Sequence, residues 1–254
     1  MTLTWDEERL PVRRLPLILM YHAVGTVGHD PNLLCVTPAR FAAQMDWLGR
    51  RGLRGVSVGA LLRARREGKA SLLVGLTFDD GYTMVAEHAV PVLARHGFTA
   101  TMFVLPGRLG GVNDWDDGTP WPLLPAARIG ELAAAGMEIG SHSATHPRLA
   151  GAHPGVLEEE IAGSRAALED LTGQPVNGFA YPYGSLDDAA VAAVRDAGYG
   201  YACAVAPAGP PGRFALPRVY AGQADGPARL VVKRLVYRAY FSRGYHRNAK
   251  GTRP

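Results

Sequence analysis

The chain has 254 residues, of which 47% are hydrophobic and 20% charged, with 31 glycines and 19 prolines. This is an ordinary globular composition at a length that one large domain can fill, and it excludes disordered and fibrous chains. We find no internal repeat of about 20 to 50 residues, which excludes solenoids and propellers. No run approaches about 20 apolar residues, which excludes a membrane-spanning helix.

The charge is unevenly distributed along the chain. Lys and Arg number 27 against 23 Asp and Glu, a net +4 that by itself suggests a nucleic-acid partner. Residues 229–254 hold eight of the cations and no acid, so the first 228 residues carry 19 cations and all 23 acids. The body is therefore −4 and the tail +8. No base-reading motif accompanies the tail, and we expect no nucleic-acid partner.

The N-terminus and the cysteines bear on the cellular compartment. The first residues are acidic and precede only a short apolar run without a small-residue cleavage site, which is not the pattern of a secretory signal. We therefore expect a cytoplasmic protein. Cys35 and Cys203 lie too far apart to suggest a disulfide framework or a metal motif, and we expect two buried thiols.

Apolar runs of strand length alternate with segments of helical period, the pattern of βαβ units and a parallel sheet. Most runs are continuously apolar, as in strands covered on both faces. The expected strands are Leu15–Tyr21, a weaker one around Val56, Leu72–Phe78, Thr99–Leu105, Met137–Gly140, Gly178–Tyr181, Tyr199–Val205 and a weaker one over Phe214–Val219.

The helices expected between these strands have recognisable ends. Thr37 is an N-cap, followed by Pro38 at the first helical position. The other helices are expected from about Tyr82 to His96, and over Pro125–Ala135, Pro154–Leu171 and Asp187–Ala197. Residues 106–124 have no period and predict a long loop of the kind that often serves a function. We expect an N-terminal segment (1–14), one α/β barrel-like domain (15–226) and a basic C-terminal region (227–254).

Two strand ends carry side chains that suggest a metal. One expected strand ends at Asp79 and Asp80, adjacent carboxylates that repel unless a cation or a proton relieves them. The alternative is a surface turn in which one Asp caps a helix. After another strand, His142 and His146 are four residues apart, and Zn²⁺ accepts two His and one carboxylate. A structural or surface pair is the alternative, and the nearby Asp pair favours the metal.

Two further strand ends are less specific. The turn Tyr181–Gly184 can aim a backbone N–H into a pocket, where it would stabilise an oxyanion. A plain strand-to-helix turn with a core Tyr is the alternative. His22 ends the first strand, and a hydrogen-bonded core histidine is the usual explanation for such a residue.

The motifs TFDDGY, HSATHP and YPYG, in that order, resemble the polysaccharide deacetylase family (NodB homology domain, carbohydrate esterase family 4). The opening LILMYHAV resembles the bacterial branch that includes poly-N-acetylglucosamine deacetylases. The resemblance covers roughly Leu17 to Val219. It implies a distorted (β/α) barrel of about seven strands, and in this branch the motif order looks circularly permuted.

By that resemblance, Asp79 is the general base, and Asp80, His142 and His146 hold a divalent metal, with zinc expected first and nickel, cobalt or iron as alternatives. The metal polarises the acetamide carbonyl and acidifies a bound water, whose proton Asp79 removes. The oxyanion would then form between the metal and the backbone N–H of Tyr183.

The sequence departs from the family at two places. The family's general acid is a His in a Leu-x-x-His motif, but Phe214–Val219 contains no His, so we assign His22 to this role. Ala180 stands where many members carry an Arg that pairs with the catalytic Asp. We hypothesise that Arg218 reaches Asp79 instead, and a surface Arg is the alternative.

The long loop holds Asn113, Asp114, Trp115, Asp116 and Trp121. Aromatic side chains stack on sugar rings, so this loop is a candidate substrate wall, and packing under a lid is the alternative. The residues that we group as substrate-binding are Trp115, Asp114, Pro182 and Arg218.

We therefore expect a metal-dependent hydrolase that removes N-acetyl, or less favourably O-acetyl, groups from an amino-sugar-containing glycan or glycoside. One alternative is a catalytically weak carbohydrate-binding or membrane-associated module, which the missing Arg permits. Another is a hydrolase of a different, cyclic amide.

The C-terminal region predicts a basic amphipathic helix from Pro227 to Phe241. One side of this helix holds Val231, Val232, Leu235, Val236 and Ala239, with cations around the rest. For its first half we favour a helix docked on the barrel by this apolar stripe. The remainder suggests a peripheral anchor for anionic lipid, or a handle for an anionic polymer.

Overall fold

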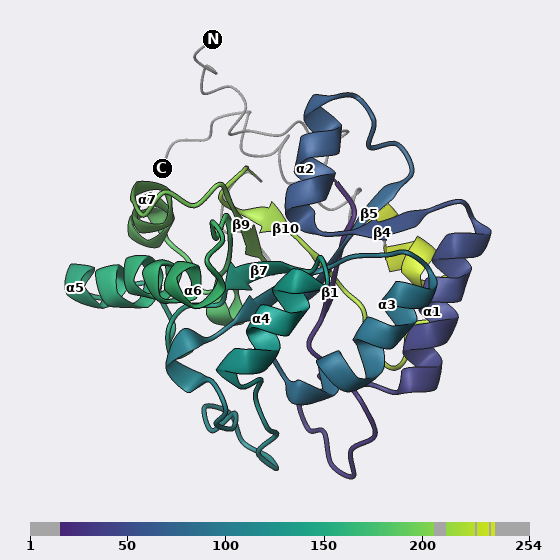
Figure 1. The fold of residues 1–254 in the computed structure, drawn as a ribbon, viewed down its shortest axis with the longest axis horizontal. Helices are drawn as coiled ribbons and strands as arrows, with labels where there is room; N and C mark the ends of the chain where they lie inside the picture. Colours follow the sequence, from purple (N-terminus) through teal and green to yellow (C-terminus); the bar gives the residue numbers. More distant parts are fainter. Residues whose placement is uncertain (1–15, 206–211, 227, 234, 237–254) are drawn as a thin grey trace, which may run out of the picture.

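The computed structural model describes residues 16–205, 212–226, 228–233 and 235–236 (Figure 1). The expected N-terminal segment (1–14) and most of the C-terminal tail lie outside the described residues.

Parallel strands form the centre of the molecule. Six of them are neighbours in the order β9, β8, β7, β6, β5 and β1. Their bounds are Ile18–Tyr21 (β1), Leu73–Phe78 (β5), Thr101–Val104 (β6), Glu138–Ser141 (β7), Gly178–Ala180 (β8) and Tyr201–Ala204 (β9). They match six of the expected strands, with ends that differ by up to three residues.

One extended segment joins the two edges of this sheet. β10 (Leu216–Pro217) pairs with β9, and β11 (Val219–Tyr220) pairs with β1, with only Arg218 between them. The sheet is thereby nearly closed into a barrel, whose wall among the described residues consists of these six strands and the segment 216–220. The expected distorted barrel of about seven strands is confirmed.

The distortion comes from β4 (Arg54–Val56), which pairs with the first half of β5, whereas β6 pairs with the second half. β2 (Ala23–Val24) and β3 (Cys35–Val36) form a separate parallel pair. The sequence did not predict this pair, because two residues are too few to show a period.

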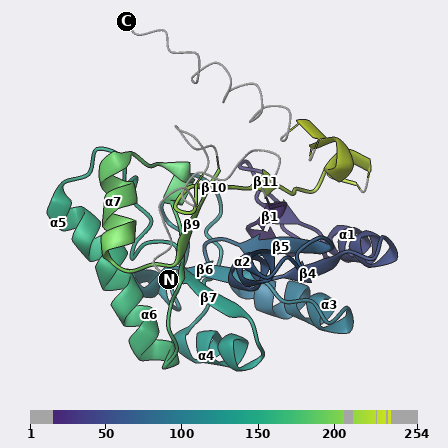
Figure 2. The same ribbon diagram turned by 90° about the horizontal axis from the view of Figure 1, so that it is seen from above.

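Helices cover the outside of the barrel (Figures 1 and 2). They are α1 (Pro38–Arg50), α2 (Val58–Arg66), α3 (Val90–Arg95), α4 (Ala126–Ala134), α5 (Pro154–Leu157), α6 (Ser164–Thr172) and α7 (Asp188–Asp196). α2 was not expected. Two π-helical segments, Val85–Ala89 and Glu158–Gly163, lead into α3 and join α5 to α6. Short 3₁₀ turns span Pro106–Arg108 and Pro182–Gly184.

The expected helix starts are confirmed. The Thr37 side chain accepts a hydrogen bond from the Arg40 amide, and Asp187 caps α7 in the same way through the Ala190 amide. Such side chains satisfy backbone donors that a helix leaves unpaired at its first turn.

Apolar side chains form two buried clusters, the smaller of which joins strand residues to helix α2. Phe103 lies in this smaller cluster, and Gly140 gives it room: a Cβ on Gly140 would lie 2.6 Å from the ring. Cys35 and Cys203 are free and buried, as expected. Among the described residues, no helix combines the length and hydropathy needed to cross a membrane.

The C-terminal region is helical at residues 228–233 and 235–236. The first half of this helix contacts the body, as expected, but the apolar stripe is not its contact surface: Val231 is only half-buried, and Val232, Leu235 and Val236 are 55%, 60% and 61% exposed. Leu230, 4% exposed, and Lys233 make the contact instead. The expected helix beyond residue 236 lies outside the described residues.

Candidate active site

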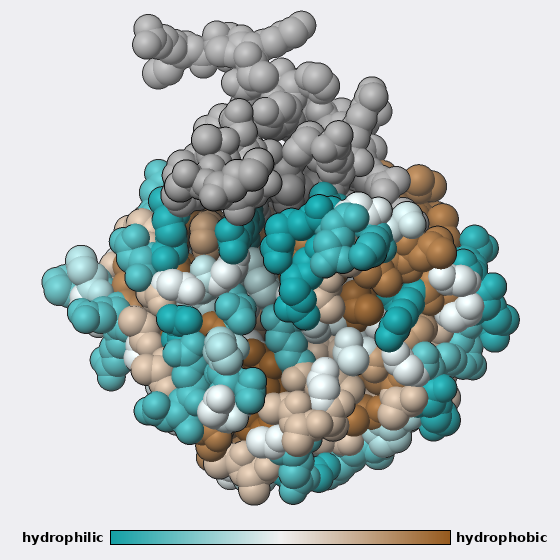
Figure 3. Space-filling view, turned by 45° about the horizontal axis from the view of Figure 1, so that its top comes forward, coloured by the Kyte–Doolittle hydropathy of each residue, from teal (hydrophilic) through white to brown (hydrophobic). Residues whose placement is uncertain are grey.

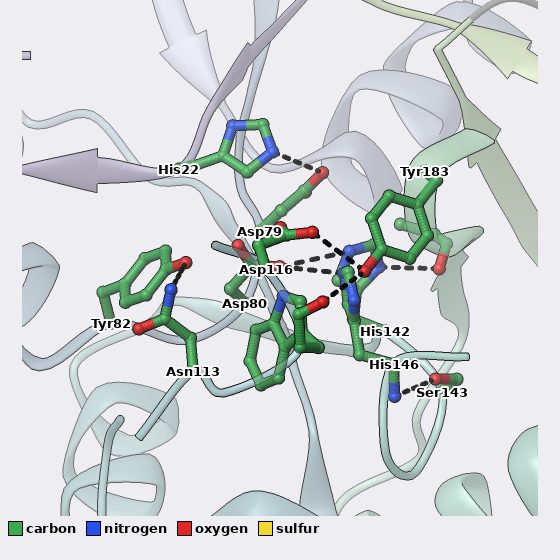
Figure 4. Close-up of polar contacts among 12 residues, drawn as sticks. His22, Asp79, Asp80, Tyr82, Asn113, Asp116, His142, Ser143, His146 and Tyr183 are labelled. Atoms are coloured by element: carbon green, nitrogen blue, oxygen red, sulfur yellow. Dashed lines mark hydrogen bonds and ion pairs between the residues drawn. The ribbon is translucent and has the colours of Figure 1, made fainter. Parts of the chain in front are cut away.

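The two adjacent carboxylates at the end of β5 point in different directions. Asp80 has a left-handed backbone (φ 69°), and Gly81 follows with φ 76°. This conformation is costly for a residue other than glycine and is found mainly where function requires it. Asp79 consequently faces Arg218. Asp80 instead faces His142 and His146 (Figure 4).

Asp79 forms a two-pronged ion pair with Arg218. The two guanidinium nitrogens donate to Oδ1 at 2.6 Å and to Oδ2 at 2.7 Å, and the carboxylate is 2% exposed. Burial alone raises the pKa of Asp79, but Arg218, His142 and His22 together outweigh it and hold that pKa below its ordinary value. Asp79 is therefore ionised at neutral pH.

The position of Arg218 follows from the closure of the barrel. Arg218 lies between β10 and β11, and its side chain points inwards, where it also donates to Thr77 Oγ1 at 3.1 Å. The hypothesis that Arg218 reaches Asp79 is confirmed, and the surface alternative is wrong. Its grouping with substrate-binding residues is also wrong, because the guanidinium is fully buried and occupied by Asp79.

Asp80, His142 and His146 converge on one point. Asp80 Oδ1 lies 3.4 Å from Nε2 of each histidine, and one ligand atom from each residue lies within 4.8 Å of the others. All three residues are buried. The carboxylate therefore lies close to both imidazoles, as we expected from the sequence.

The donor pattern of this cluster fits a metal. His142 Nδ1–H donates to the Ala180 carbonyl at 2.8 Å, so in the neutral imidazole Nε2 carries a lone pair that faces Asp80 Oδ1. That oxygen has no hydrogen-bond partner among the described residues. Facing acceptors at a buried site call for a cation between them, and a carbonyl that orients a ligand His is usual in metal centres.

The same cluster shifts the protonation equilibria. Burial raises the pKa of Asp80, but the two imidazoles beside it prevail and hold that pKa well below its ordinary value. Burial lowers the pKa of His142, but Asp80 and Asp79 raise it above its ordinary value. For His146, burial prevails and lowers the pKa. The carboxylate is therefore charged and available as a ligand.

Glu160 fixes the loop that carries the two histidines. Its carboxylate is buried and accepts from the Ala144 amide at 2.8 Å and from the Thr145 amide and hydroxyl at 2.9 and 2.5 Å. His146 at the end of this loop has φ 75°, a strained value. This role of Glu160 was not predicted, because the residue belongs to three consecutive glutamates that resemble a solvated helix surface.

His22 approaches Asp79 from the side opposite the two metal-site histidines (Figure 4). Its Nε2 lies 4.0 Å from Asp79 Oδ2, beyond hydrogen-bond distance, and its side chain is 16% exposed. Its Nδ1 has no hydrogen-bond partner among the described residues. These features differ from those of a hydrogen-bonded core histidine.

Aromatic side chains flank His146 on two sides. Trp115 stacks on its ring at 4.5 Å between centroids, and Tyr183 meets it edge-on at 4.6 Å. The Tyr183 hydroxyl donates to Asp116 at 3.1 Å, which ties the long loop to the turn after β8. We expected Asp116 in the long loop, but we did not predict its contact with Tyr183.

The other expected substrate-side residues have different surroundings. Asp114 pairs with Arg108 at 3.1 Å on the surface, and Pro182 is buried in its turn. Trp121 is 8% exposed and packs against Tyr82, so it has the packing role that we held as the alternative. Contact of Trp115, Asp114 or Pro182 with a substrate stays a prediction.

Tyr183 has a left-handed backbone (φ 57°) and a side chain 38% exposed, with the Arg148 guanidinium 4.3 Å above its ring. The strained turn brings this residue beside the metal-site cluster. The role of its N–H toward an oxyanion stays a prediction.

The sequence of this chain is similar to those of known proteins. Residues 67–202 match the sequence model of a family described as polysaccharide deacetylase. The chain is 29% identical over 200 residues to YxkH, a candidate polysaccharide deacetylase of Bacillus subtilis, covering 78% of this chain and 66% of the relative. It is 23% identical over 176 residues to the poly-β-1,6-N-acetyl-D-glucosamine N-deacetylase of Staphylococcus epidermidis, covering 65% and 60%.

A solved structure is also similar. A polysaccharide deacetylase from Bacillus cereus has a TM-score of 0.72 and 27% identity, covering 85% of this chain and 68% of that one. The chain thus spans about two thirds of the length of the Bacillus subtilis relative and 60% of that of the Staphylococcus epidermidis relative.

Proposed function

Since the chain belongs to the polysaccharide deacetylase family, we propose that it is a metal-dependent hydrolase that removes N-acetyl groups from an amino-sugar-containing glycan or glycoside. The name of the Staphylococcus relative supports N-acetylglucosamine units as the substrate class. The reaction adds water across the acetamide and yields acetate and a free amine.

The main support for this proposal is that two adjacent carboxylates bind different partners. Asp79 is paired with Arg218, and Asp80 with the two histidines. Asp80, His142 and His146 would hold the metal. When bound there, a divalent ion supplies Lewis-acid polarisation of the acetamide and lowers the pKa of water.

Asp79 is the general base of the proposed reaction. Its carboxylate, kept ionised by Arg218, takes a proton from the attacking water. The ion pair also prevents rotation of the carboxylate, because both oxygens are held by the guanidinium fork.

His22 is the general acid in this proposal. Its Nε2 lies near Asp79, yet its ring is partly exposed and reachable by a leaving amine. A proton donated from this ring converts the departing nitrogen into a neutral amine. Trp115 and Tyr183 exclude water from one side of the site and offer aromatic faces to a sugar ring.

The pairing of Arg218 with Asp79 weighs against a catalytically weak binding module. That alternative was permitted by the Ala180 position, where no Arg supports the base. Arg218 supplies the same charge from the segment that closes the barrel.

Acetate release tests the proposal. The wild-type chain and Asp79→Asn are incubated with N-acetylglucosamine oligomers, lipid-linked amino sugars, small glycosides and a cyclic amide. We expect acetate from at least one acetylated sugar, with the rate falling about 10²–10⁴-fold in Asp79→Asn. Binding without acetate release would favour the binding module, and turnover of the cyclic amide alone would favour the other hydrolase.

A further inference from the structure

The helical residues 228–233 and 235–236 turn apolar side chains away from the protein. Val232, Leu235 and Val236 are each more than half exposed, and their spacing of three and four residues places them on one side of the helix. Hydrophobic surface is visible at the upper right of the space-filling view, next to hydrophilic side chains (Figure 3). Neighbouring exposed apolar residues, unlike single ones, indicate an interaction site.

The opposite side of the helix is fastened to the body, which fixes this orientation. Lys233 Nζ pairs with Asp225 at 2.5 Å, and Asp225 is 2% exposed. The Asp225 carboxylate also accepts from the Gly222 amide at 2.8 Å, and its backbone carbonyl accepts from Gln44 Nε2 at 2.7 Å. Leu230 is buried at the same contact. Turning Val232, Leu235 and Val236 inwards would separate Lys233 from this buried carboxylate, which is strongly unfavourable.

We propose that this outward face is an anchor that binds the surface of an anionic lipid bilayer. The three apolar side chains belong to a stretch of sequence, residues 229–254, that contains eight cations and no acid. At a bilayer surface, apolar side chains enter the boundary of the acyl chains while cations face anionic head groups. The same segment contains the aromatic residues Tyr237, Tyr240, Phe241 and Tyr245, a class of side chain enriched at that boundary.

The charge argues against a second copy of the chain as the occupant of this face. A two-fold interface presents the same patch on both partners, so two segments of +8 would oppose each other. A soluble polyanion would neutralise the cations but would leave Val232, Leu235 and Val236 in water. An anionic bilayer would bind both the apolar side chains and the cations.

Vesicle co-sedimentation of the whole 254-residue chain tests the proposal. The vesicles are phosphatidylcholine alone, or phosphatidylcholine with phosphatidylglycerol. The test variant is Val232→Ser/Leu235→Ser/Val236→Ser. The matched control is Leu72→Ser/Val156→Ser, two residues that are 56% and 41% exposed elsewhere on the surface. Circular dichroism melting checks that both variants remain folded.

We expect the wild type and the control to bind anionic vesicles, and binding to weaken at 1 M salt, where the Debye length is about 3 Å. The triple serine variant should bind at least about tenfold more weakly, because it lacks the apolar contribution. Equal binding by the folded triple variant and the wild type would overturn the proposal and leave a purely electrostatic contact, as with an acidic polymer. Absence of binding by the wild type, or equal binding to neutral and anionic vesicles, would overturn it as well.

Discussion

Replacement of Arg218 by Met tests the ion pair beneath the active site. The substitution keeps an unbranched side chain of similar length but removes the cation and both hydrogen bonds to Asp79. Without Arg218, the largest effect on the pKa of the buried Asp79 carboxylate is desolvation, which raises it. Asp79 should therefore be protonated over a larger part of the acid range.

The magnitude follows from the two charged hydrogen bonds. At about 1.5–3 kcal/mol each, their loss costs about 3–6 kcal/mol, in line with the ~3–5 kcal/mol typical of breaking a buried pair from one side. We expect a comparable fall in the free energy of unfolding. If the base function is also lost, kcat/KM should fall about 10²–10⁴-fold.

The assay is the pH profile of acetate release together with urea unfolding. The acid limb of the kcat/KM profile should move to higher pH in Arg218→Met. In Arg218→Lys the acid limb should lie between those of Arg218→Met and the wild type, because Lys keeps the positive charge but lacks the two-pronged guanidinium. Arg128→Met is the matched control, because Arg128 pairs with Glu131 on the surface. A wild-type profile and wild-type stability in Arg218→Met would refute the reasoning.

Three further substitutions test separate parts of the site and fold. His22→Ala should lower turnover about 10²–10⁴-fold and leave the metal content intact, and unchanged turnover would remove His22 from the mechanism. Glu160→Gln should weaken metal affinity about 10–100-fold in equilibrium dialysis, whereas the exposed Glu159→Gln should not, and equal affinities would show that the loop holds its shape unaided. Hydrogen bonds from the Ala190 amide of α7 and from the Gly151 amide lower the pKa of Asp187. Its contribution to stability is therefore complete above the unfolded pKa of about 3.9 and is lost as pH falls through the lower folded pKa. In Asp187→Asn, the free energy of unfolding in urea should fall less steeply as the pH drops through this range. An unchanged pH dependence would contradict this role of Asp187.

Much of the site was predictable because its parts are local. Asp79 and Asp80 follow directly on one apolar strand and His142 on another, with His146 four residues further along, and parallel strands bring their carboxyl ends to one edge. The sequence therefore indicated both the barrel and the residues of the candidate metal site without any tertiary information.

The remaining features depend on contacts between distant segments. Arg218 reaches Asp79 only because the segment 216–220 closes the barrel, and Glu160 supports the His loop from a helix that reads as solvated. The sequence pattern of the C-terminal helix gave its apolar stripe but not its orientation, because the pairing of Lys233 with Asp225 decides which side faces the body.

The central claim is that Asp80, His142 and His146 hold a metal that deacetylation requires. Its most direct test is acetate release by the wild-type chain before chelation, after chelation and dialysis, and after addition of zinc. We expect release to be lost on chelation and restored by zinc in the wild type, but not restored in Asp80→Ala. Full acetate release by the metal-free chain would contradict the account.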